Sequence, residues 1–127
     1  MRRPLNLSIL PGVFAICRLD AAAPIPSWVT SRDFFSITRT RDELSIVCQQ
    51  RDVPAGVRCE RDWRALKVEG KLDFALTGIL ASLAAPLADA GISIFAISTY
   101  DTDYLLLKET NLPRAVQVLS VAGLRIR

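Results

Sequence analysis

Apolar and polar residues alternate with a period of two through much of the first half of the chain. Residues 5–10 (LNLSIL), 34–41 (FFSITRTR) and 43–50 (ELSIVCQQ) follow this pattern, and residues 13–19 form a short, mostly apolar run. A period of two places alternate side chains on opposite faces of a strand. We therefore expect two strands followed by a β-hairpin, and no long helix in this half.

The second half changes to helical spacing. A stripe of apolar residues at intervals of three and four predicts a helix over residues 76–90, in which Pro86 removes one backbone hydrogen bond. Gly91 follows where a glycine often ends a helix. A second helix is expected to start at Asn111 and to end at Gly123. The apolar stripe of the first helix is Leu76, Ile79, Leu80, Leu83 and Leu87.

Four strand-like runs flank these helices, at residues 63–68, 92–99, 104–108 and 124–126. The order strand–helix–strand–strand–helix–strand is the ferredoxin-like plan. We expect an α+β fold, an antiparallel sheet with both helices on one face. The first half, with strand-like runs alone, reads as a degenerate copy of that plan. The expected domains are residues 1–60 and residues 61–127.

Composition excludes several kinds of chemistry. Of 127 residues, 50% are hydrophobic and none is histidine, so histidine-based triads and zinc sites with imidazole ligands are excluded. The net charge of +3 is mild for a nucleic-acid-binding protein. No glycine-rich phosphate loop, nucleophile motif or metal-ligand cluster is present, so we expect no enzyme, metal or cofactor.

The cysteines and the apolar segments predict where the protein resides. Cys17, Cys48 and Cys59 form no CxxC pair, and we expect them to act as small hydrophobic residues. Thiols without a disulfide framework are typical of a reducing compartment. The arginine-led N-terminus is broken by polar residues, and residues 75–98 are interrupted by Pro86, so neither reads as a signal peptide or a membrane span. We expect a cytoplasmic protein.

Residues 71–99, KLDFALTGILASLAAPLADAGISIFAIST, resemble the opening of an ACT domain, a small amino-acid-sensing module. The run from Leu87 to Ile92 matches the family's Leu-x-x-x-Gly-Ile sequence. Residues 92–107, ISIFAISTYDTDYLLL, look like small bacterial tandem ACT proteins related to CASTOR arginine sensors, and like the regulatory ACT domains of aspartate kinases. The first half, with PGVFAICRL and FFSITRTRDELSIVC, looks like the N-terminal part of those tandem proteins.

The resemblance implies ligand binding without catalysis, with an amino acid held between two ACT units. By this resemblance, the loop after the first strand and the start of the second strand hold the ligand. In aspartate kinase ACT domains the second strand ends in a Thr/Ser-rich turn followed by an acidic residue, and residues 98–101 match that turn. The residues that correspond are Asp73, Leu76, Thr77, Gly78, Ser98, Thr99 and Asp101.

The chemistry of these residues suits an amino acid. The start of the helix near Leu76 offers free N–H groups to a carboxylate, and Asp73 and Asp101 offer acceptors to an ammonium group. Two carboxylates favour a basic ligand, arginine or lysine. Each residue also has an ordinary role: Asp73 as a helix cap, Ser98 and Thr99 as strand residues, and Asp101 as part of a solvated hairpin turn.

Two functions therefore stay open. The chain is either a regulatory amino-acid sensor that acts through another protein, or a structural module that binds no ligand and forms a homodimer. The exposed edges of small sheets favour side-by-side dimers in either case. We expect no nucleic-acid or membrane partner.

Overall fold

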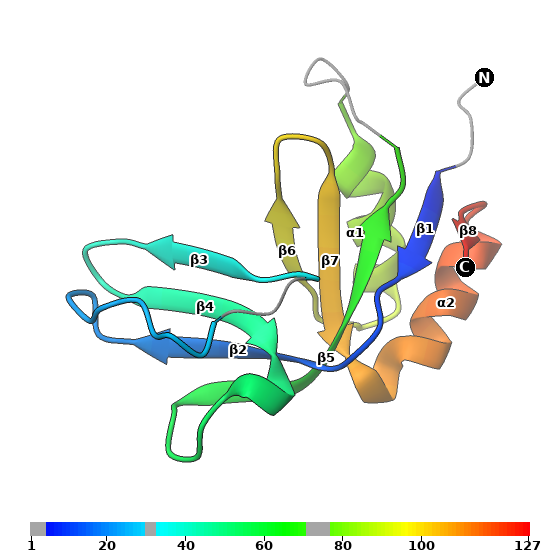
Figure 1. The fold of residues 1–127 in the computed structure, drawn as a ribbon. Helices are drawn as coiled ribbons and strands as arrows, with labels where there is room; N and C mark the ends of the chain where they lie inside the picture. The colour runs from blue at the N-terminus through cyan, green and yellow to red at the C-terminus, as the bar shows by residue number, and fades with distance from the viewer. Residues whose placement is uncertain (1–4, 30–32, 71–76) are drawn as a thin grey trace. The chain divides into compact units, whose positions relative to one another are not determined.

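The computed structural model describes residues 5–29, 33–70 and 77–127 (Figure 1). They divide into two compact units: unit 1 is residues 1–11 with 64–127, and unit 2 is residues 12–63. The elements in chain order are β1 (Asn6–Ile9), β2 (Phe14–Leu19), β3 (Ser36–Arg39), β4 (Leu44–Gln49), the 3₁₀ helix η1 (Gln50–Asp52), β5 (Cys59–Val68), α1 (Ile79–Asp89), β6 (Phe95–Ser98), β7 (Asp103–Lys108), the 3₁₀ helix η2 (Glu109–Asn111), α2 (Leu112–Val121) and β8 (Arg125–Ile126).

Unit 1 has the ferredoxin-like order of elements, with one added strand. From β5 onward the chain runs β5-α1-β6-β7-α2-β8, as the spacing predicts. The strands lie in the order β6-β7-β5-β1-β8. Strand β1 pairs antiparallel with β5, with Leu7 opposite Val68, and parallel with β8. The N-terminal strand thus lies between the first and last strands of the plan.

The sequence-based division at residue 60 placed residues 1–11 in the first domain, whereas the compact units group them with the second half. The pairing of β1 with the last residues of β5 is the physical reason. Strand β5 itself begins in unit 2 and ends in unit 1.

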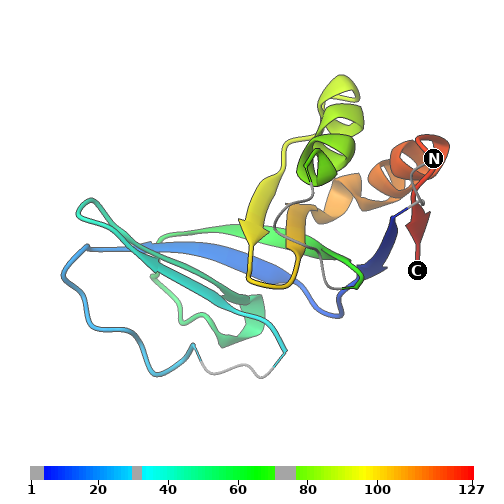
Figure 2. The same cartoon turned by 90° about the horizontal axis from the view of Figure 1, so that it is seen from above.

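Both helices of unit 1 cover the same side of its strands (Figure 2). Their buried residues, Leu83 and Leu87 in α1 and Ala115 and Leu119 in α2, pack in one cluster with residues of β1, β5 and β7. The strand residues of this cluster are Leu7, Leu66, Val68, Leu105 and Leu107. Alternate positions of β5 and β7 supply them, as expected for side chains that share one face of a sheet.

The two helices end in the same way. Gly91 has φ +74° and Gly123 has φ +97°, a left-handed conformation that favours glycine. The next residue donates its N–H to a carbonyl five residues back, Ile92 to Leu87 and Leu124 to Leu119. This is the Schellman motif, and the residue after each glycine is buried. The expected strand at 92–99 begins later, at Phe95, because Ile92 completes the helix end.

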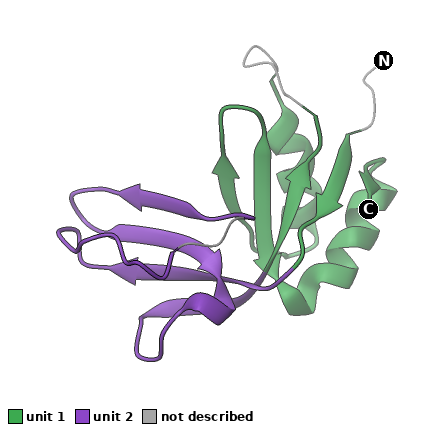
Figure 3. Cartoon of the chain, viewed as in Figure 1, with its two compact units in different colours: residues 1–11, 64–127 green, residues 12–63 purple. Residues whose placement is uncertain are grey.

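Unit 2 keeps the strand order, and its described residues form no α-helix. Figure 3 shows residues 12–63 in purple, with strands in the order β3-β4-β2-β5, all antiparallel to their neighbours. Taken in chain order, β2, β3, β4 and β5 occupy the same relative positions as β5, β6, β7 and β8 in unit 1. The described residues between β2 and β3 form turns, and only η1 precedes β5. The expected degenerate first copy is therefore confirmed.

A fixed shift relates the central hairpins of the two units. Adding 59 to the bounds of β3, β4 and η1 gives the bounds of β6, β7 and η2. The turns also correspond. Thr40 donates its N–H to the carbonyl of Glu43 at 2.9 Å, and Thr99 donates to Thr102 at 2.8 Å. In each turn the threonine hydroxyl accepts the N–H of the residue three positions on.

Candidate functional site

Three segments lie at one end of unit 1: the end of β5, the turn between β6 and β7, and the start of α1 (Figure 1). A buried hydrogen bond fixes the first two together, because the hydroxyl of Thr102 donates to the carbonyl of Val68 at 2.7 Å. Thr102 is only 4% exposed. The hairpin turn is thus anchored next to the point where the chain leaves β5 toward α1.

The hydroxyl groups of Ser98 and Thr99, which we predicted from the sequence to contact a ligand, form hydrogen bonds within the turn. Thr99 donates its hydroxyl to the carbonyl of Thr102 at 3.0 Å. Ser98 donates its hydroxyl to the Asp103 carboxylate at 2.7 Å. Both hydroxyls keep acceptor lone pairs. Their donor protons stabilise the turn, so any contact with a ligand would use the lone pairs.

The start of α1 presents backbone N–H groups. Gly78 is the N-cap, exposed and with φ +78°, and no side chain caps the helix there. The first hydrogen bond within the helix runs from the N–H of Ser82 to the carbonyl of Gly78 at 2.9 Å. The N–H groups of Ile79, Leu80 and Ala81 precede it and have no acceptor in the preceding helical turn. Such a helix start attracts an anion.

The predicted site residues divide into three sets. Thr77 and Gly78 are exposed at the start of α1, and Asp101 is exposed in the β6–β7 turn. Ser98 and Thr99 lie in the same turn with their hydroxyls hydrogen-bonded. Asp73 and Leu76 lie outside the described residues.

The structure adds two residues that sequence reasoning missed at this end of the sheet. Thr102 directly follows Asp101 in the hairpin turn that the sequence predicts to be solvated, yet it is buried and holds the turn to β5. Glu69 follows β5 directly, is half-buried and accepts a hydrogen bond from the Ser8 hydroxyl. No local pattern marks the burial of Thr102, because its partner Val68 is 34 residues away in the sequence. Nothing local marks Glu69, because its partner is 61 residues away in the sequence.

No metal-binding group is apparent among residues 5–29, 33–70 and 77–127, in which histidine, cysteine, aspartate and glutamate form no suitable cluster of three. Within the same residues, no helix has the length and apolar character needed to cross a membrane.

Comparison with known sequences decides the family. The sequence model of the ACT domain matches residues 58–121, half of the chain, from the start of β5 to the end of α2. The chain belongs to the ACT-domain family. A second model, of an N-terminal domain, matches residues 12–56. The predicted resemblance and the ferredoxin-like fold class are therefore confirmed, and the ACT match contains every described residue of the candidate site.

The ACT protein is also similar to named relatives. It is 32% identical over 107 residues to the human protein "Cytosolic arginine sensor for mTORC1 subunit 1", a match that covers 78% of this chain. This match spans only 32% of that sensor's length. A separate match to a second human relative, CASTOR3P, spans 61% of that protein's length. The chain thus spans about a third of the sensor's length, and a function like that of the whole sensor can only be proposed for this chain.

Solved structures carry the same fold. A crystal structure of a protein from Agobacterium tumefaciens is 40% identical, with a TM-score of 0.94, and the match covers 99% of this chain and 94% of that one. The regulatory subunit of aspartate kinase from Thermus thermophilus has a TM-score of 0.62 at 8% identity, covering 92% of this chain and 97% of that one. The second likeness shows the fold alone.

Proposed function

We propose that this chain is a non-catalytic regulatory protein of the cytoplasm that binds a free amino acid. The ligand lies where the start of α1 and the β6–β7 turn meet the end of β5, against a second ACT surface. The observation that carries the proposal is the anchoring of the turn. The Thr102–Val68 hydrogen bond holds an exposed carboxylate, Asp101, at the same end of unit 1 as an uncapped helix start.

The two parts of the site match the two charges of an amino acid. The N–H groups that follow Gly78 suit the ligand carboxylate, and Thr77 and Gly78 allow a close approach to them. The carboxylates of Asp101 and Glu69, with Asp73 as a third, suit an ammonium or guanidinium group. An excess of acidic groups favours arginine or lysine over a neutral amino acid. The similarity to a protein named as an arginine sensor supports the same choice.

The alternative is a structural module that forms a homodimer and binds no ligand. One observation favours it: the Ser98 and Thr99 hydroxyls already donate within the turn. Under this alternative the turn is a structural element alone, and Asp101 faces solvent.

A thermal-shift screen against the twenty amino acids, followed by calorimetry on each hit, separates the two functions. A ligand at 100 times its dissociation constant adds about 2.7 kcal/mol of stability. We expect a hit with arginine or lysine that Asp101→Ala removes. Asp42→Ala is the matched control, because Asp42 occupies the corresponding turn of unit 2 and is likewise exposed.

The outcomes are distinct. Binding that survives Asp101→Ala would move the ligand away from the β6–β7 turn. A screen without any hit would favour the homodimer module, which sedimentation of the same sample would detect directly.

A further inference from the structure

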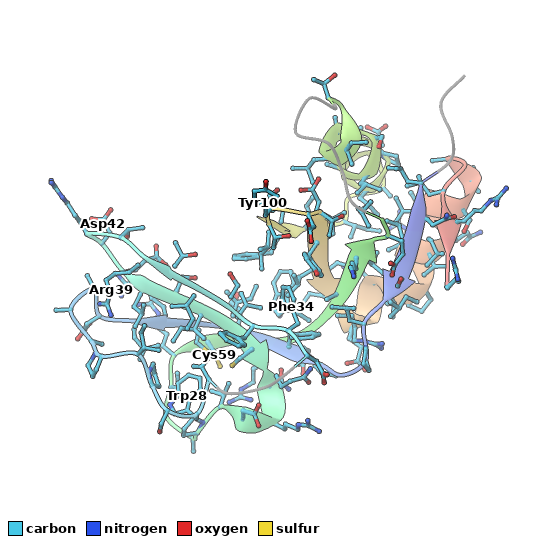
Figure 4. The ribbon with its side chains drawn as sticks, turned by 45° about the horizontal axis from the view of Figure 1, so that its top comes forward. Trp28, Phe34, Arg39, Asp42, Cys59 and Tyr100 are labelled. Atoms are coloured by element: carbon cyan, nitrogen blue, oxygen red, sulfur yellow. The ribbon has the colours of Figure 1, made fainter. Side chains whose placement is uncertain are left out.

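The three cysteines of the chain come together in unit 2. Cys48 lies in β4, Cys17 in β2 and Cys59 in β5, on strands that are neighbours in the sheet. All three belong to or pack against the core cluster of unit 2. Trp28 packs against the same cluster, and Figure 4 labels both Trp28 and Cys59 in unit 2. Strands far apart in the sequence thus place three free thiols together.

Two of these cysteines face each other across a strand pair. Cys17 of β2 is directly opposite Cys59 of β5. The next pair along, Arg18 and Arg58, is hydrogen-bonded, since the Arg18 N–H donates to the Arg58 carbonyl at 3.0 Å. Hydrogen-bonded and non-hydrogen-bonded pairs alternate in an antiparallel ladder, so Cys17 and Cys59 form a non-hydrogen-bonded pair.

This pairing suits a disulfide. The Cα atoms of a non-hydrogen-bonded pair are about 4.5 Å apart and their side chains approach closely, within the range of about 4.4–6.8 Å that disulfides need. Cys48 is placed differently, because it faces Ala15 across β2 and β4. The backbone therefore favours one of the three possible pairings.

Access to solvent distinguishes the two partners. Cys17 is 1% exposed and Cys48 is fully buried. Cys59 is half-buried, at the start of β5 on the edge of the unit 2 strand order. A small oxidant reaches Cys59 first.

We propose that Cys17 and Cys59 form a redox-active thiol pair, which hydrogen peroxide converts to a disulfide between β2 and β5. Peroxide oxidises the Cys59 thiol to a sulfenic acid and releases one water molecule. The Cys17 sulfur then attacks the Cys59 sulfur. The S–S bond forms, the hydroxyl of the sulfenic acid leaves with the Cys17 proton as a second water molecule, and two thiols have reduced one peroxide. This modification is independent of amino-acid binding.

The residues around Cys59 predict that peroxide oxidises its thiol slowly, and that this oxidation becomes faster as the pH rises. Burial raises the pKa of the Cys59 thiol, and the neighbouring Cys17 and Glu60 add to the increase, while Arg61 opposes it. A hydrogen bond to Cys48 and burial also raise the pKa of Cys17. Because the thiolate is the reactive form, we expect the oxidation rate to increase about tenfold per pH unit between pH 7 and pH 8.

The test oxidises the reduced 127-residue chain with hydrogen peroxide, then alkylates and digests it for mass spectrometry. We expect the intact chain to lose two hydrogen atoms, and one peptide pair to link Cys17 with Cys59. One thiol of three should remain reactive after unfolding. A link through Cys48, a link between two chains, oxidation of Cys59 to a sulfinic acid beside a free Cys17, or three unchanged thiols would each overturn the proposal.

Two variants and one stability measurement complete the test. Cys59→Ser should abolish the link, whereas Cys48→Ala should keep it, because the Cys17–Cys59 pair stays intact. The disulfide joins residues about forty positions apart, so oxidation should raise the thermal midpoint, followed by tryptophan fluorescence, by about 10 °C. Both tryptophans, Trp28 and Trp63, lie in unit 2 and report on it. An unchanged midpoint in a fully linked sample would show that the bond does not constrain unit 2.

Discussion

The two units share a strand order and a hairpin, and they differ in what lies between the strands. Unit 1 joins its strands through α1 and α2, whereas the described connections of unit 2 are turns and η1. The hairpin positions still correspond at a shift of 59 residues. The difference teaches that strand pairing and turn geometry persist without the helices. The described residues of unit 2 form no helix start that could attract an anion, so the proposed ligand site takes its anion-binding part from unit 1.

Unit 2 holds its connecting segment by other means. Arg39, at the end of β3, donates hydrogen bonds to the carbonyls of Ala21 and Ala23. At the corresponding position unit 1 has Ser98, which bonds within its own hairpin. Ala23 and Val29 then pack on the core of unit 2. The Arg39 side chain thus stabilises the segment after β2 by hydrogen bonds, whereas in unit 1 the corresponding segment contains α1, which packs on the strands.

The largest effect should come from the helical core of unit 1. Leu87 is fully buried in α1, so Leu87→Ala removes its contacts and leaves a cavity. We expect a loss of about 2–5 kcal/mol in the free energy of unfolding. Urea unfolding followed by circular dichroism at 222 nm measures this, because α1 and α2 both belong to unit 1. Val121→Ala is the control, at a residue 84% exposed.

Tryptophan fluorescence in the same experiment sharpens the comparison, since both tryptophans lie in unit 2. Strand β5 begins in unit 2 and ends in unit 1, so we expect both signals to shift to lower urea together. A fluorescence transition that stays in place would mean that unit 2 unfolds independently.

A smaller effect is expected at the anchor of the β6–β7 turn. Thr102→Val keeps the shape of the side chain but removes the hydroxyl that bonds the Val68 carbonyl. A buried carbonyl left without its partner costs about 1–3 kcal/mol, measured by the same unfolding curves. Thr38→Val, at an exposed position of β3, is the control and should change stability by less than about 0.5 kcal/mol. Equal losses in both variants would contradict the anchoring role.

The positions of most helices and strands could be predicted from the sequence, but the pairing of the strands could not. Alternation in residues 5–10 predicted β1, yet nothing in that pattern names β5 and β8 as its partners. Leucine spacing and Gly91 placed the body and the end of α1. Asn111 is the N-cap of α2 as predicted, but its side chain makes no capping hydrogen bond, since η2 leads the chain into the helix.

The candidate site divides in the same way. Residue types and family resemblance pointed to Thr77, Gly78 and Asp101, which the structure places at one end of unit 1. The resemblance gave no indication that the Ser98 and Thr99 hydroxyls are engaged in the turn, or that Thr102 is buried. Hydrogen-bond partners depend on the folded backbone, which a local pattern does not contain.

Removal of the Arg39 side chain tests how unit 2 replaces a helix. Arg39→Ala deletes both hydrogen bonds to the segment after β2, and we expect a loss of about 1 kcal/mol because the guanidinium is exposed. Amide hydrogen exchange should accelerate in residues 20–29 and stay unchanged in α1. Arg41→Ala is the control, because it removes a neighbouring exposed cation. If amide hydrogen exchange in residues 20–29 accelerates equally in both variants, the positive charge, rather than the two hydrogen bonds of Arg39, holds this segment in place.

The smallest effects are expected at the turn threonines that correspond in the two units, with the larger loss in unit 1. Thr40→Val and Thr99→Val each remove a hydroxyl that accepts the N–H three residues on, in turns that correspond at a shift of 59. The freed N–H of Glu43 is near the surface, where water satisfies it, so we expect Thr40→Val to cost about 0.5 kcal/mol. The freed N–H of Thr102 belongs to a residue only 4% exposed, so Thr99→Val should cost about 1 kcal/mol. Unfolding curves of both variants measure the difference. Equal losses would mean that the turn is a local motif, indifferent to the helices around it. A larger loss for Thr99→Val would show that the stability of unit 1 depends more strongly on this turn hydrogen bond than the stability of unit 2 does.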